Sequence, residues 1–176
     1  MTQQYSTPVR GLCFRVATRE DVPVLLGLIR ELAEFERLTD QVQADEATLA
    51  AELFGSRTVA EAVLADLDGE AVGFAVFFHN FSTFLGRAGL YLEDLYVQPH
   101  ARGRGVGKGL IRFVAKIAVD RKCGRLEWSV LDWNTHAVDF YRSLGAVAMD
   151  GWTVQRVTGS ALERLGSFEL PPLQQR

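Results

Sequence analysis

The hydrophobic pattern of the chain begins with an apolar stripe that has the period of a helix. Thr18, with Asp21 three positions later and Pro23 in the first turn, is typical of a helix start. Glu36 is the next residue on the stripe, and a carboxylate there either reaches solvent at the helix end or lines a cavity that the helix borders. The apolar members of the stripe, spaced at the 3.6-residue period, are Val22, Leu25, Leu26, Ile29, Leu32 and Ala33.

Runs of β-forming residues predict the strands of a sheet. Two of these runs flank Asp68-Gly69, a pair that favours a tight hairpin turn. A short helix from Asp45 to Phe54, ended by Gly55, precedes the hairpin. The predicted strands are Phe14–Val16, Val63–Asp66, Ala71–Phe78, Tyr91–Val97, Leu126–Leu131 and Trp152–Val157, with a loop over His79–Ala88.

Two further helices are predicted in the second half of the chain. One runs from a glycine-rich loop to about Cys123, and the other is short and is ended by Gly145. The resulting order, β-α-α-β-β-β-α-β-α-β, predicts an α/β (α+β) fold in which a mixed sheet carries helices on both faces. The apolar faces consist of Leu110, Ile111, Val114, Ile117 and Ala118 in the first helix and of Ala137, Phe140, Tyr141 and Leu144 in the second.

Glycines alternate with cations in the loop before the first of these helices. Backbone N–H groups at the start of a helix have no intrahelical partner and bind phosphate readily. A P-loop needs Ser or Thr after its lysine, whereas Gly109 follows Lys108 here. The pattern therefore predicts a different kind of phosphate site, and the alternative is a basic, flexible turn. The residues of this loop are Arg102, Gly103, Arg104, Gly105, Val106, Gly107 and Lys108.

Two adjacent carboxylates, Glu93 and Asp94, interrupt the strand before this loop. Burying a carboxylate costs several kcal/mol unless it is paired, hydrogen-bonded or protonated. One interpretation is an edge strand that carries one solvated charge on each face. The other is a strand that frays or bulges beside a ligand and supplies an acid to chemistry.

Tyr141 and Asn134 each have a structural and a functional interpretation. A tyrosine on the apolar face of a helix is commonly a core residue with a satisfied hydroxyl, and Asn134 by itself is a helix cap. A phenol with a pKa near 10 is also a suitable proton donor to a leaving group. The turn at Trp133-Asn134, which comes shortly before Phe140-Tyr141, favours a functional role for both residues.

Composition limits the classes of function. The chain has 176 residues, 48% of them hydrophobic, which is enough for one core. We expect one domain over residues 11–165, between a flexible N-terminus (1–10) and a C-terminal tail (166–176). The net charge of −3 and the absence of an 18-residue apolar segment predict no nucleic-acid and no membrane partner. Cys13 and Cys123 have no partners at metal-ligand spacing, so we expect no disulfide, no metal and a cytoplasmic location.

Several short motifs occur in order between Arg15 and Trp152. Together they resemble the diamine (spermidine/spermine) N-acetyltransferase branch of the GNAT superfamily, in which Arg-x-x-Gly-x-Gly binds pyrophosphate. The resemblance implies a mostly antiparallel mixed sheet, acetyl-CoA as co-substrate, and a homodimer with pockets at the subunit interface. The motifs are Leu28–Glu36, Tyr91–Asp94, Arg102–Gly107, Leu131–Asn134, Phe140-Tyr141 with Leu144–Ala146, and Gly151-Trp152.

The resemblance also implies roles for individual residues. Tyr141 matches the family's general acid, and Glu93 matches the acid that positions and deprotonates the amine through water. Asn134 matches a residue that reaches the pantetheine arm of acetyl-CoA, which inserts between two central strands. The strand residues implied to pair with that arm are Leu95, Tyr96 and Val97, and those implied to line the amine pocket are Phe35, Glu36 and Asp150.

Ser82-Thr83 stands where the polyamine enzymes carry an acid, and it matches the thialysine Nε-acetyltransferase branch. The resemblance therefore implies a thialysine- or lysine-like acceptor whose carboxylate receives hydrogen bonds from the hydroxyls of Ser82 and Thr83. Polyamine N1-acetylation and acetylation of a protein amine are alternatives. A CoA-binding regulatory module without catalysis is another, although the presence of Glu93 and Tyr141 argues against it.

Overall fold

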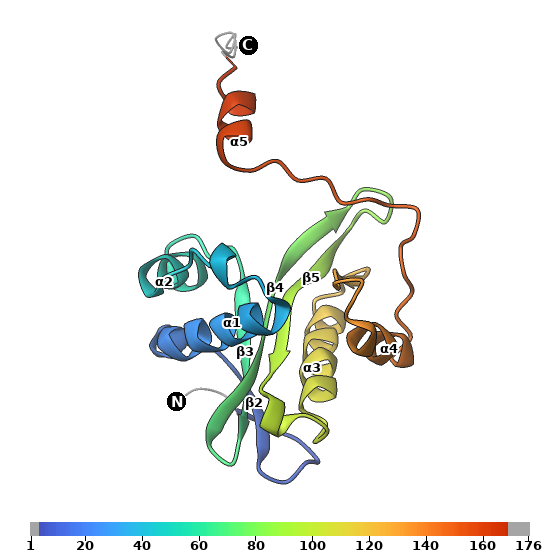
Figure 1. Ribbon diagram of the computed structural model, residues 1–176. Coiled ribbons are helices and arrows are strands. Elements are labelled where there is room, and N and C mark those ends of the chain that lie inside the picture. The colour runs from blue at the N-terminus through green and yellow to red at the C-terminus, as the bar shows by residue number, and fades with distance from the viewer. Residues whose placement is uncertain (1–3, 169–176) are drawn as a thin grey trace. The chain divides into compact units, whose positions relative to one another are not determined.

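The computed structural model describes residues 4–168 and divides into two units, Met1–Ser129 and Val130–Arg176. The first unit contains a six-stranded sheet: β1 (Gln4–Ser6), β2 (Leu12–Val16), β3 (Glu61–Leu67), β4 (Glu70–Ser82), β5 (Arg87–Val97) and β6 (Leu126–Trp128). The strands lie side by side in sequence order (Figure 1). All neighbours are antiparallel except β5 and β6, which are parallel. The predicted mixed, mostly antiparallel sheet is confirmed.

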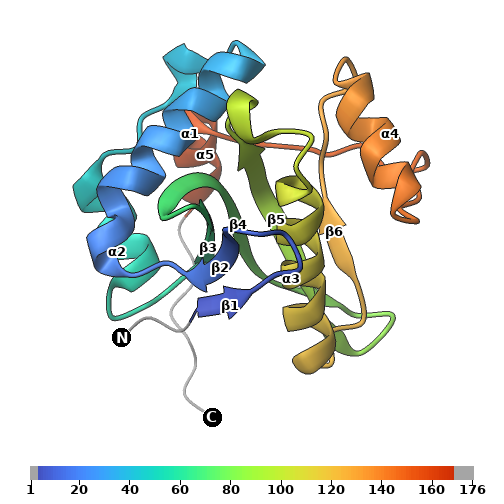
Figure 2. The same ribbon diagram turned by 90° about the horizontal axis from the view of Figure 1, so that it is seen from below.

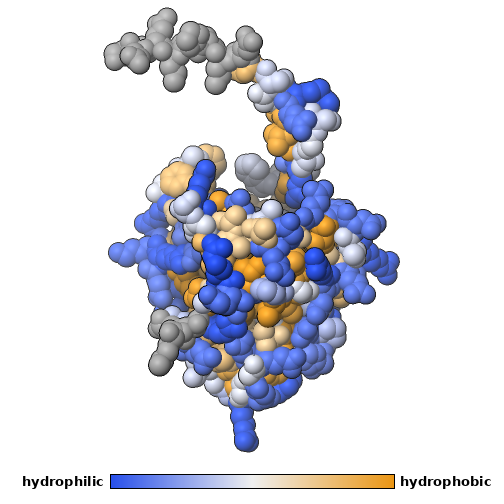
Figure 3. All heavy atoms as spheres, turned by 90° about the vertical axis from the view of Figure 1, so that its left-hand side faces the viewer, coloured by the Kyte–Doolittle hydropathy of each residue, from blue (hydrophilic) through white to orange (hydrophobic). Residues whose placement is uncertain are grey.

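The helices of this unit are α1 (Val22–Glu36), α2 (Glu46–Phe54) and α3 (Val106–Asp120), and short 3-10 turns lie at η1 (Arg19–Asp21), η2 (Thr39–Gln41) and η3 (Pro99–Ala101). α1 and α2 cover one face of the sheet and α3 covers the other (Figures 1 and 2). Helices on both faces were predicted from the sequence. On the side of α1 and α2, hydrophilic residues surround smaller areas of hydrophobic ones (Figure 3).

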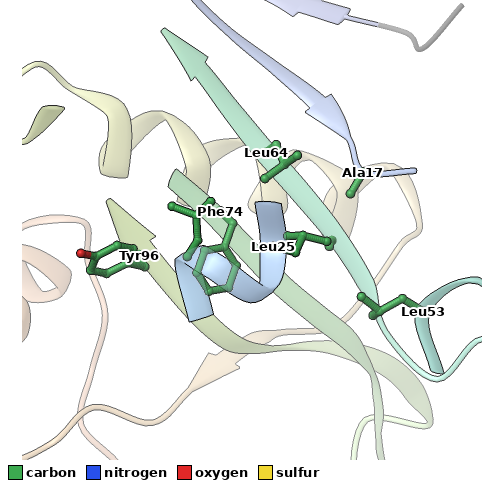
Figure 4. Close-up of a cluster of buried hydrophobic side chains, with 8 residues drawn as sticks. Ala17, Leu25, Leu53, Leu64, Phe74 and Tyr96 are labelled. Atoms are coloured by element: carbon green, nitrogen blue, oxygen red, sulfur yellow. The ribbon is translucent and has the colours of Figure 1, made fainter. Parts of the chain in front are cut away.

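The core between α1 and the sheet explains why the apolar stripe specifies the position of the helix. Leu25 and Leu28 are buried against side chains of β3, β4 and β5 (Figure 4). Leu25 and Phe74 are fully buried, and burial of one such side chain contributes roughly 1.5–3 kcal/mol. The buried members of this cluster are Ala17, Leu25, Leu28, Leu53, Ala62, Leu64, Phe74 and Tyr96.

The predicted hairpin at Asp68-Gly69 is confirmed. Asp68 and Gly69 have φ angles of 54° and 90°, and positive values at both central residues are typical of a tight turn between twisted strands. The N–H of Asp68 also donates a hydrogen bond to the carbonyl oxygen of Gly11 at 2.8 Å. The turn therefore connects β3 and β4 and is tied to the start of β2.

The predicted loop over residues 79–88 is mostly strand. β4 continues to Ser82 and β5 begins at Arg87, so only residues 83–86 form the turn, where Gly86 has a φ of 59°. Backbone hydrogen bonds between two strands do not depend on apolar side chains. The polar residues of this stretch therefore continue the ladder as a two-stranded ribbon.

The predicted strand over Trp152–Val157 is wrong, because these residues belong to no strand or helix. Trp152 and Val154 are 74% and 77% exposed. A strand needs a neighbour for its backbone hydrogen bonds, and β-forming residue types do not supply one. Two other ends also differ from the prediction: β6 stops at Trp128, and Gln4–Ser6, within the predicted flexible N-terminus, pairs with β2 as β1.

The second unit contains two helices, α4 (Thr135–Ser143) and α5 (Gly159–Gly166). α4 confirms the predicted short helix, and Asn134 caps it, since its Oδ1 accepts a hydrogen bond from the N–H of Ala137 at 3.2 Å. Of the predicted C-terminal tail, residues 169–176 lie outside the described residues. Among residues 4–168, no helix is both long and apolar enough to cross a bilayer.

Candidate active site

The pairing between β5 and β6 is short and leaves much of one β5 edge open. The parallel ladder joins Leu90, Tyr91 and Leu92 of β5 to residues 126–128 of β6. Beyond Leu92, residues 94–97 pair with β4 on one side, and within residues 4–168 no strand pairs with residues 93–97 on the other. The sheet therefore offers a row of strand backbone to a ligand at this place.

The open edge begins at a β-bulge. Val76 of β4 is opposite Asp94, whereas the next residue, Phe77, is opposite Leu92, so Glu93 is the extra residue of β5. Glu93 is exposed. The bulge is one of the two arrangements predicted for the adjacent carboxylates. The alternative, one solvated charge on each face, does not fit Asp94, which is half-buried.

Hydrogen-bond alternation identifies the backbone groups on the open edge. The N–H of Gln98 donates to the carbonyl oxygen of Val72 at 2.9 Å, so this position is a hydrogen-bonded pair. In an antiparallel ladder every second pair is of this type. The N–H and C=O groups of Tyr96 are therefore directed to β4, and those of Leu95 and Val97 are directed to the open edge. Of the three residues predicted to pair with pantetheine, Leu95 and Val97 direct their backbone groups to the open edge, and their pairing with pantetheine stays a prediction.

Carboxylates gather on the α1 side of β5. Asp94 is half-buried, and burial raises its pKa to about 6, with further contributions from the charges of Glu93 and Glu36. Burial also raises the pKa of Glu36, the last residue of α1. The partial burial of Glu36 agrees with the interpretation in which it borders a site, and that role stays a prediction. Such perturbed carboxyl groups commonly mark functional sites.

Sequence reasoning selected Glu93 and passed over its neighbour. Asp94 is two residues from buried Tyr96, so alternation along the strand places both side chains on the α1 face. This alternation is the sequence signal from which Asp94 could have been predicted as a residue of the site. The bulge, which exposes Glu93 at the start of the open edge, was anticipated only as one of two alternatives.

The glycine-rich loop has the backbone that the sequence pattern predicts. Gly103 and Gly105 have φ angles of 73° and 83°, which residues with a Cβ rarely adopt. α3 begins directly after Gly105, and its first hydrogen bond is donated by the N–H of Gly109 to the carbonyl oxygen of Gly105 at 2.9 Å. The amides before Gly109 belong to the first turn, where N–H groups have no intrahelical acceptor. Arg104 and Lys108 are exposed beside them.

Arg102, the first residue of the loop motif, contacts protein groups. Its Nε donates a hydrogen bond to the carbonyl oxygen of Val97 at 2.9 Å. Its Cζ lies 4.8 Å from the centre of the Phe35 ring and 5.7 Å from that of the Tyr96 ring. Phe35, predicted to line the amine pocket, is 40% exposed in α1. The predicted pocket wall and the predicted phosphate loop are therefore in contact through this guanidinium.

The structure does not bring Ser82 and Thr83 to the carboxylates of the same chain. Ser82 is buried, and its Oγ accepts a hydrogen bond from the N–H of Leu85 at 3.2 Å in the β4–β5 turn. Arg87, which is opposite Ser82, precedes Glu93 by six residues, a separation of about 20 Å along a strand. A single lysine-like molecule is much shorter than that distance.

The other predicted site residues belong to the second unit. Asn134 is the cap of α4, Tyr141 is half-buried in that helix, and Asp150 is exposed in a turn. The rings of Phe140 and Tyr141 lie 5.2 Å apart, centre to centre. The roles of Asn134, Tyr141 and Asp150 in the site remain predictions.

Comparison with known proteins agrees with this description. The acetyltransferase (GNAT) family model matches residues 27–146. The thialysine N-epsilon-acetyltransferase of Bos taurus is 40% identical to the chain over 162 residues, which cover 86% of this chain and 95% of that protein. The L-ornithine N5-acetyltransferase of Arabidopsis thaliana is 33% identical, with coverage of 89% and 88%. An integron cassette protein from the mobile metagenome of V. cholerae has a similar structure, with a TM-score of 0.77, 26% identity and coverage of 90% and 99%.

These similarities include the parts of the molecule that form the candidate site. The family match extends from α1 through the bulge and the glycine loop to the end of α4. The resemblance to diamine and thialysine acetyltransferases, which the motifs indicated, is confirmed by relatives that align over almost their whole length. The chain therefore belongs to the GNAT family of acetyltransferases, which use acetyl-CoA, and is an acyltransferase enzyme.

Proposed function

We propose that the enzyme transfers an acetyl group from acetyl-CoA to the side-chain amine of a small, lysine-like amino acid such as thialysine. The observation that carries this proposal is the bulge at Glu93, where an open strand edge meets a group of carboxylates. The edge suits an amide-containing chain such as pantetheine, and the carboxylates suit an ammonium group. The names of the relatives from Bos taurus and Arabidopsis thaliana support an amino-acid acceptor.

The residues of the first unit fit acetyl-CoA. The amides of Gly103–Lys108 at the start of α3, together with Arg104 and Lys108, are suited to its pyrophosphate. The outward N–H and C=O groups of Leu95 and the outward N–H of Val97 are suited to the amides of its pantetheine arm, whereas the carbonyl oxygen of Val97 accepts a hydrogen bond from Arg102 Nε. Asn134 is the predicted contribution of the second unit. When bound, acetyl-CoA supplies a thioester whose acetyl group an amine can take up. The enzyme itself forms no covalent intermediate in this proposal.

The carboxylates would prepare the amine for attack. An alkylamine with a pKa near 10.4 is mostly protonated at pH 7, and exposing its lone pair costs about 4 to 5 kcal/mol. Asp94 and Glu36 would hold the ammonium group, and Glu93 would accept its proton, through water, at the start of the open edge. Tyr141 would give its phenolic proton to the leaving sulfur, since a phenol is still protonated at pH 7.

The charge of the site favours an acceptor with one amine end. Each charge of a desolvated polyamine needs a carboxylate partner. The carboxylates described above lie together near Asp94, and the β4–β5 turn carries Ser82 and Thr83 in place of an acid. A lysine-like acceptor presents one ammonium to Asp94 and a carboxylate to neutral or cationic donors.

A homodimer would bring those donors to the site. Ser82 and Thr83 are about 20 Å along β5 from Glu93 of the same chain, so they would contact the acceptor of a second copy. The turn also exposes Phe81, Phe84 and Leu85, at 62%, 94% and 52%, and a second copy would cover these side chains. Light scattering after size exclusion tests this arrangement. Phe84→Ser should shift the protein toward monomer, and a wild-type monomer contradicts the dimer.

An amine panel tests the proposed acceptor. CoA release is measured with thialysine, lysine, putrescine, spermidine and spermine at one acetyl-CoA concentration, and kcat/KM is compared. We expect thialysine to exceed spermidine and spermine by at least about tenfold, which is about 1.4 kcal/mol of transition-state discrimination. A tenfold preference for either polyamine would identify a polyamine acetyltransferase. CoA binding without CoA release for any amine would identify a regulatory module.

A further inference from the structure

Arg102 differs from the other cations of the glycine loop in what it contacts. Arg104 forms an ion pair on the surface with Asp68, in which Nη2 lies 3.9 Å from Oδ2. Arg102 instead donates through Nε to the carbonyl oxygen of Val97 at 2.9 Å. That carbonyl belongs to the open edge of β5. The Arg102 guanidinium therefore holds the last residue of the edge at which the pantetheine arm is proposed to bind.

The same guanidinium reaches the last turn of α1. Its Cζ lies 4.8 Å from the Phe35 ring centre, a distance at which a cation is attracted to the face of an aromatic ring. A second link between α1 and the end of β5 lies close by in the sequence. Gln98 Nε2 donates to the two carboxylate oxygens of Glu31 at 2.9 and 3.1 Å. The second half of α1 is thus joined to the end of β5 and to the residue that follows it by a cation–π contact and a side-chain hydrogen bond.

The position of this last turn matters because it carries Glu36. Glu36 directly follows Phe35, and its charge contributes to the raised pKa of Asp94. A shift of the α1 end would therefore move a carboxylate of the amine site. Phe35, which is predicted to line the amine pocket and is partly exposed, also belongs to this turn. The same shift would therefore move a side chain that lines the proposed pocket.

We propose that Arg102 is a positioning residue that fixes the last turn of α1 against the end of β5, and thereby sets the spacing between the acceptor wall and the cofactor edge. The inference rests on the proposed acetyl transfer to a small amine. Arg102 acts through Phe35 and the Val97 carbonyl and does not touch the reacting atoms. It goes beyond the role expected from the loop motif, which was positive charge for a phosphate.

Lysine separates the two roles. Arg102→Lys keeps the charge but removes the Nε–H at this position and the planar group that lies over Phe35. A residue that served the phosphate by charge alone would tolerate the change. A positioning residue would not tolerate the change, because the lysine ammonium lacks the planar surface of the guanidinium and its fixed arrangement of several N–H donors. Arg104→Gln is the matched contrast, since it removes a loop charge that does not contact α1.

Hydrogen–deuterium exchange of the unliganded protein provides a readout that is independent of activity. Arg102→Lys should speed exchange of residues 31–36 by about two- to fivefold, the factor that corresponds to loss of one exposed cation–π contact. Arg104→Gln should leave exchange at residues 31–36 unchanged. Equal exchange in wild type and Arg102→Lys would overturn the proposal.

Kinetics with thialysine and acetyl-CoA supply the second readout. Arg102→Lys should raise KM for thialysine by about tenfold, because the acceptor wall is displaced, and raise KM for acetyl-CoA by less than about threefold. Phe35→Leu should raise KM for thialysine as well. The double variant should show less than the product of the two effects, since both changes remove one contact.

The outcomes separate this proposal from the proposed function. An Arg102→Lys effect confined to acetyl-CoA, or full additivity with Phe35→Leu, returns Arg102 to a phosphate-binding role and overturns the inference. A wild-type protein that releases no CoA with any amine contradicts the proposed function instead. The exchange measurement at residues 31–36 then still decides whether Arg102 holds the end of α1.

Discussion

The two sides of β5 carry opposite chemistry, suited to the two proposed ligands: the phosphates of acetyl-CoA on one side and an amine on the other. On the α3 side, the chain offers backbone amides and cations at Gly103–Lys108. On the α1 side, it offers the carboxylates of Asp94 and Glu36, both of which have raised pKa values because of burial. The phosphate side depends on the absence of side chains at positive φ, whereas the amine side depends on charges held partly out of water.

The comparison shows that the two sides differ in how they tolerate change. Gly103 and Gly105 adopt a positive φ that residues with a Cβ rarely adopt. A larger residue at either position would therefore strain the backbone of the loop. Asp94 does not require an unusual backbone conformation. The free-energy cost of placing Asp94 there comes from the desolvation of its charged carboxylate. Substitutions should therefore abolish function on the phosphate side through geometry, and tune function on the amine side through ionisation.

Tyr141→Phe should produce the largest effect, because the phenol is proposed to serve the step that joins both ligands. The change keeps the ring and removes only the proton. General acid catalysis contributes about 10²- to 10⁴-fold, and kcat should fall by that amount while the Kd for acetyl-CoA changes little. Rapid-quench or steady-state assays measure kcat, and calorimetry measures Kd. A loss of less than about threefold would assign Tyr141 to packing alone.

Gly105→Val tests the phosphate side. A branched residue at a φ of 83° is strained, and a Cβ at this position would contact the side chain of Val9 at 3.7 Å, so the substitution should distort the backbone directly before α3. We expect acetyl-CoA affinity to fall at least about a hundredfold, measured by calorimetry on a variant that retains its circular-dichroism spectrum. Gly86→Val is the control, since Gly86 also has positive φ, at 59°, but lies in the β4–β5 turn. Equal losses in both variants would indicate general strain and not a phosphate site.

Asp94→Asn tests the amine side. A carboxylate must be ionised to hold an ammonium, so wild-type kcat/KM for the amine should fall below pH 6, where Asp94 takes up a proton. The variant should lose about tenfold in kcat/KM at pH 7.5 and show no decline of its own near pH 6. Asp40→Asn, at an exposed position, serves as the control. An unchanged pH profile in Asp94→Asn would exclude Asp94 as the titrating group.

The same substitution should also change stability, with a sign opposite to that of its effect on activity. Asp94 binds a proton more tightly in the folded protein, with a pKa of about 6, than at its ordinary value of 3.8. The free energy of unfolding therefore falls as pH rises between these values, and the loss persists at higher pH. Asp94→Asn should be more stable than wild type by about 1 to 3 kcal/mol at pH 8, and by little at pH 4. Denaturant unfolding at the two pH values measures the difference, and a variant less stable at pH 8 contradicts it.

Elements whose residues repeat with a clear period were predictable from the sequence. The stripe of α1, the amphipathic face of α3 and the turn at Asp68-Gly69 follow from local chemistry and are present in the structure. The absence of a strand over Trp152–Val157 was not predictable in this way. Its residue types favour strands, but a strand exists only where a neighbour supplies backbone partners.

The site shows the same division between local and long-range information. The positive-φ glycines before α3 follow from a pattern of adjacent residues. The contact between Arg102 and Phe35 joins residues 67 positions apart in the printed sequence, and no local pattern specifies it. The choice between Glu93 and Asp94 likewise depends on the bulge, which is a property of how β4 and β5 align. The distance of Ser82 from Glu93 depends on the same ladder.

The open edge of β5 makes the stability of the enzyme depend on the concentration of acetyl-CoA. An unpaired row of strand backbone is a template on which another polypeptide can add a strand, and it invites aggregation. When acetyl-CoA occupies this edge as proposed, it also stabilises the folded state, by about 2.7 kcal/mol at a concentration of 100 times its Kd. At low acetyl-CoA concentration, the unliganded enzyme would therefore aggregate and be degraded faster than the liganded enzyme. The amount of enzyme would then fall with the concentration of acetyl-CoA without a separate regulatory protein.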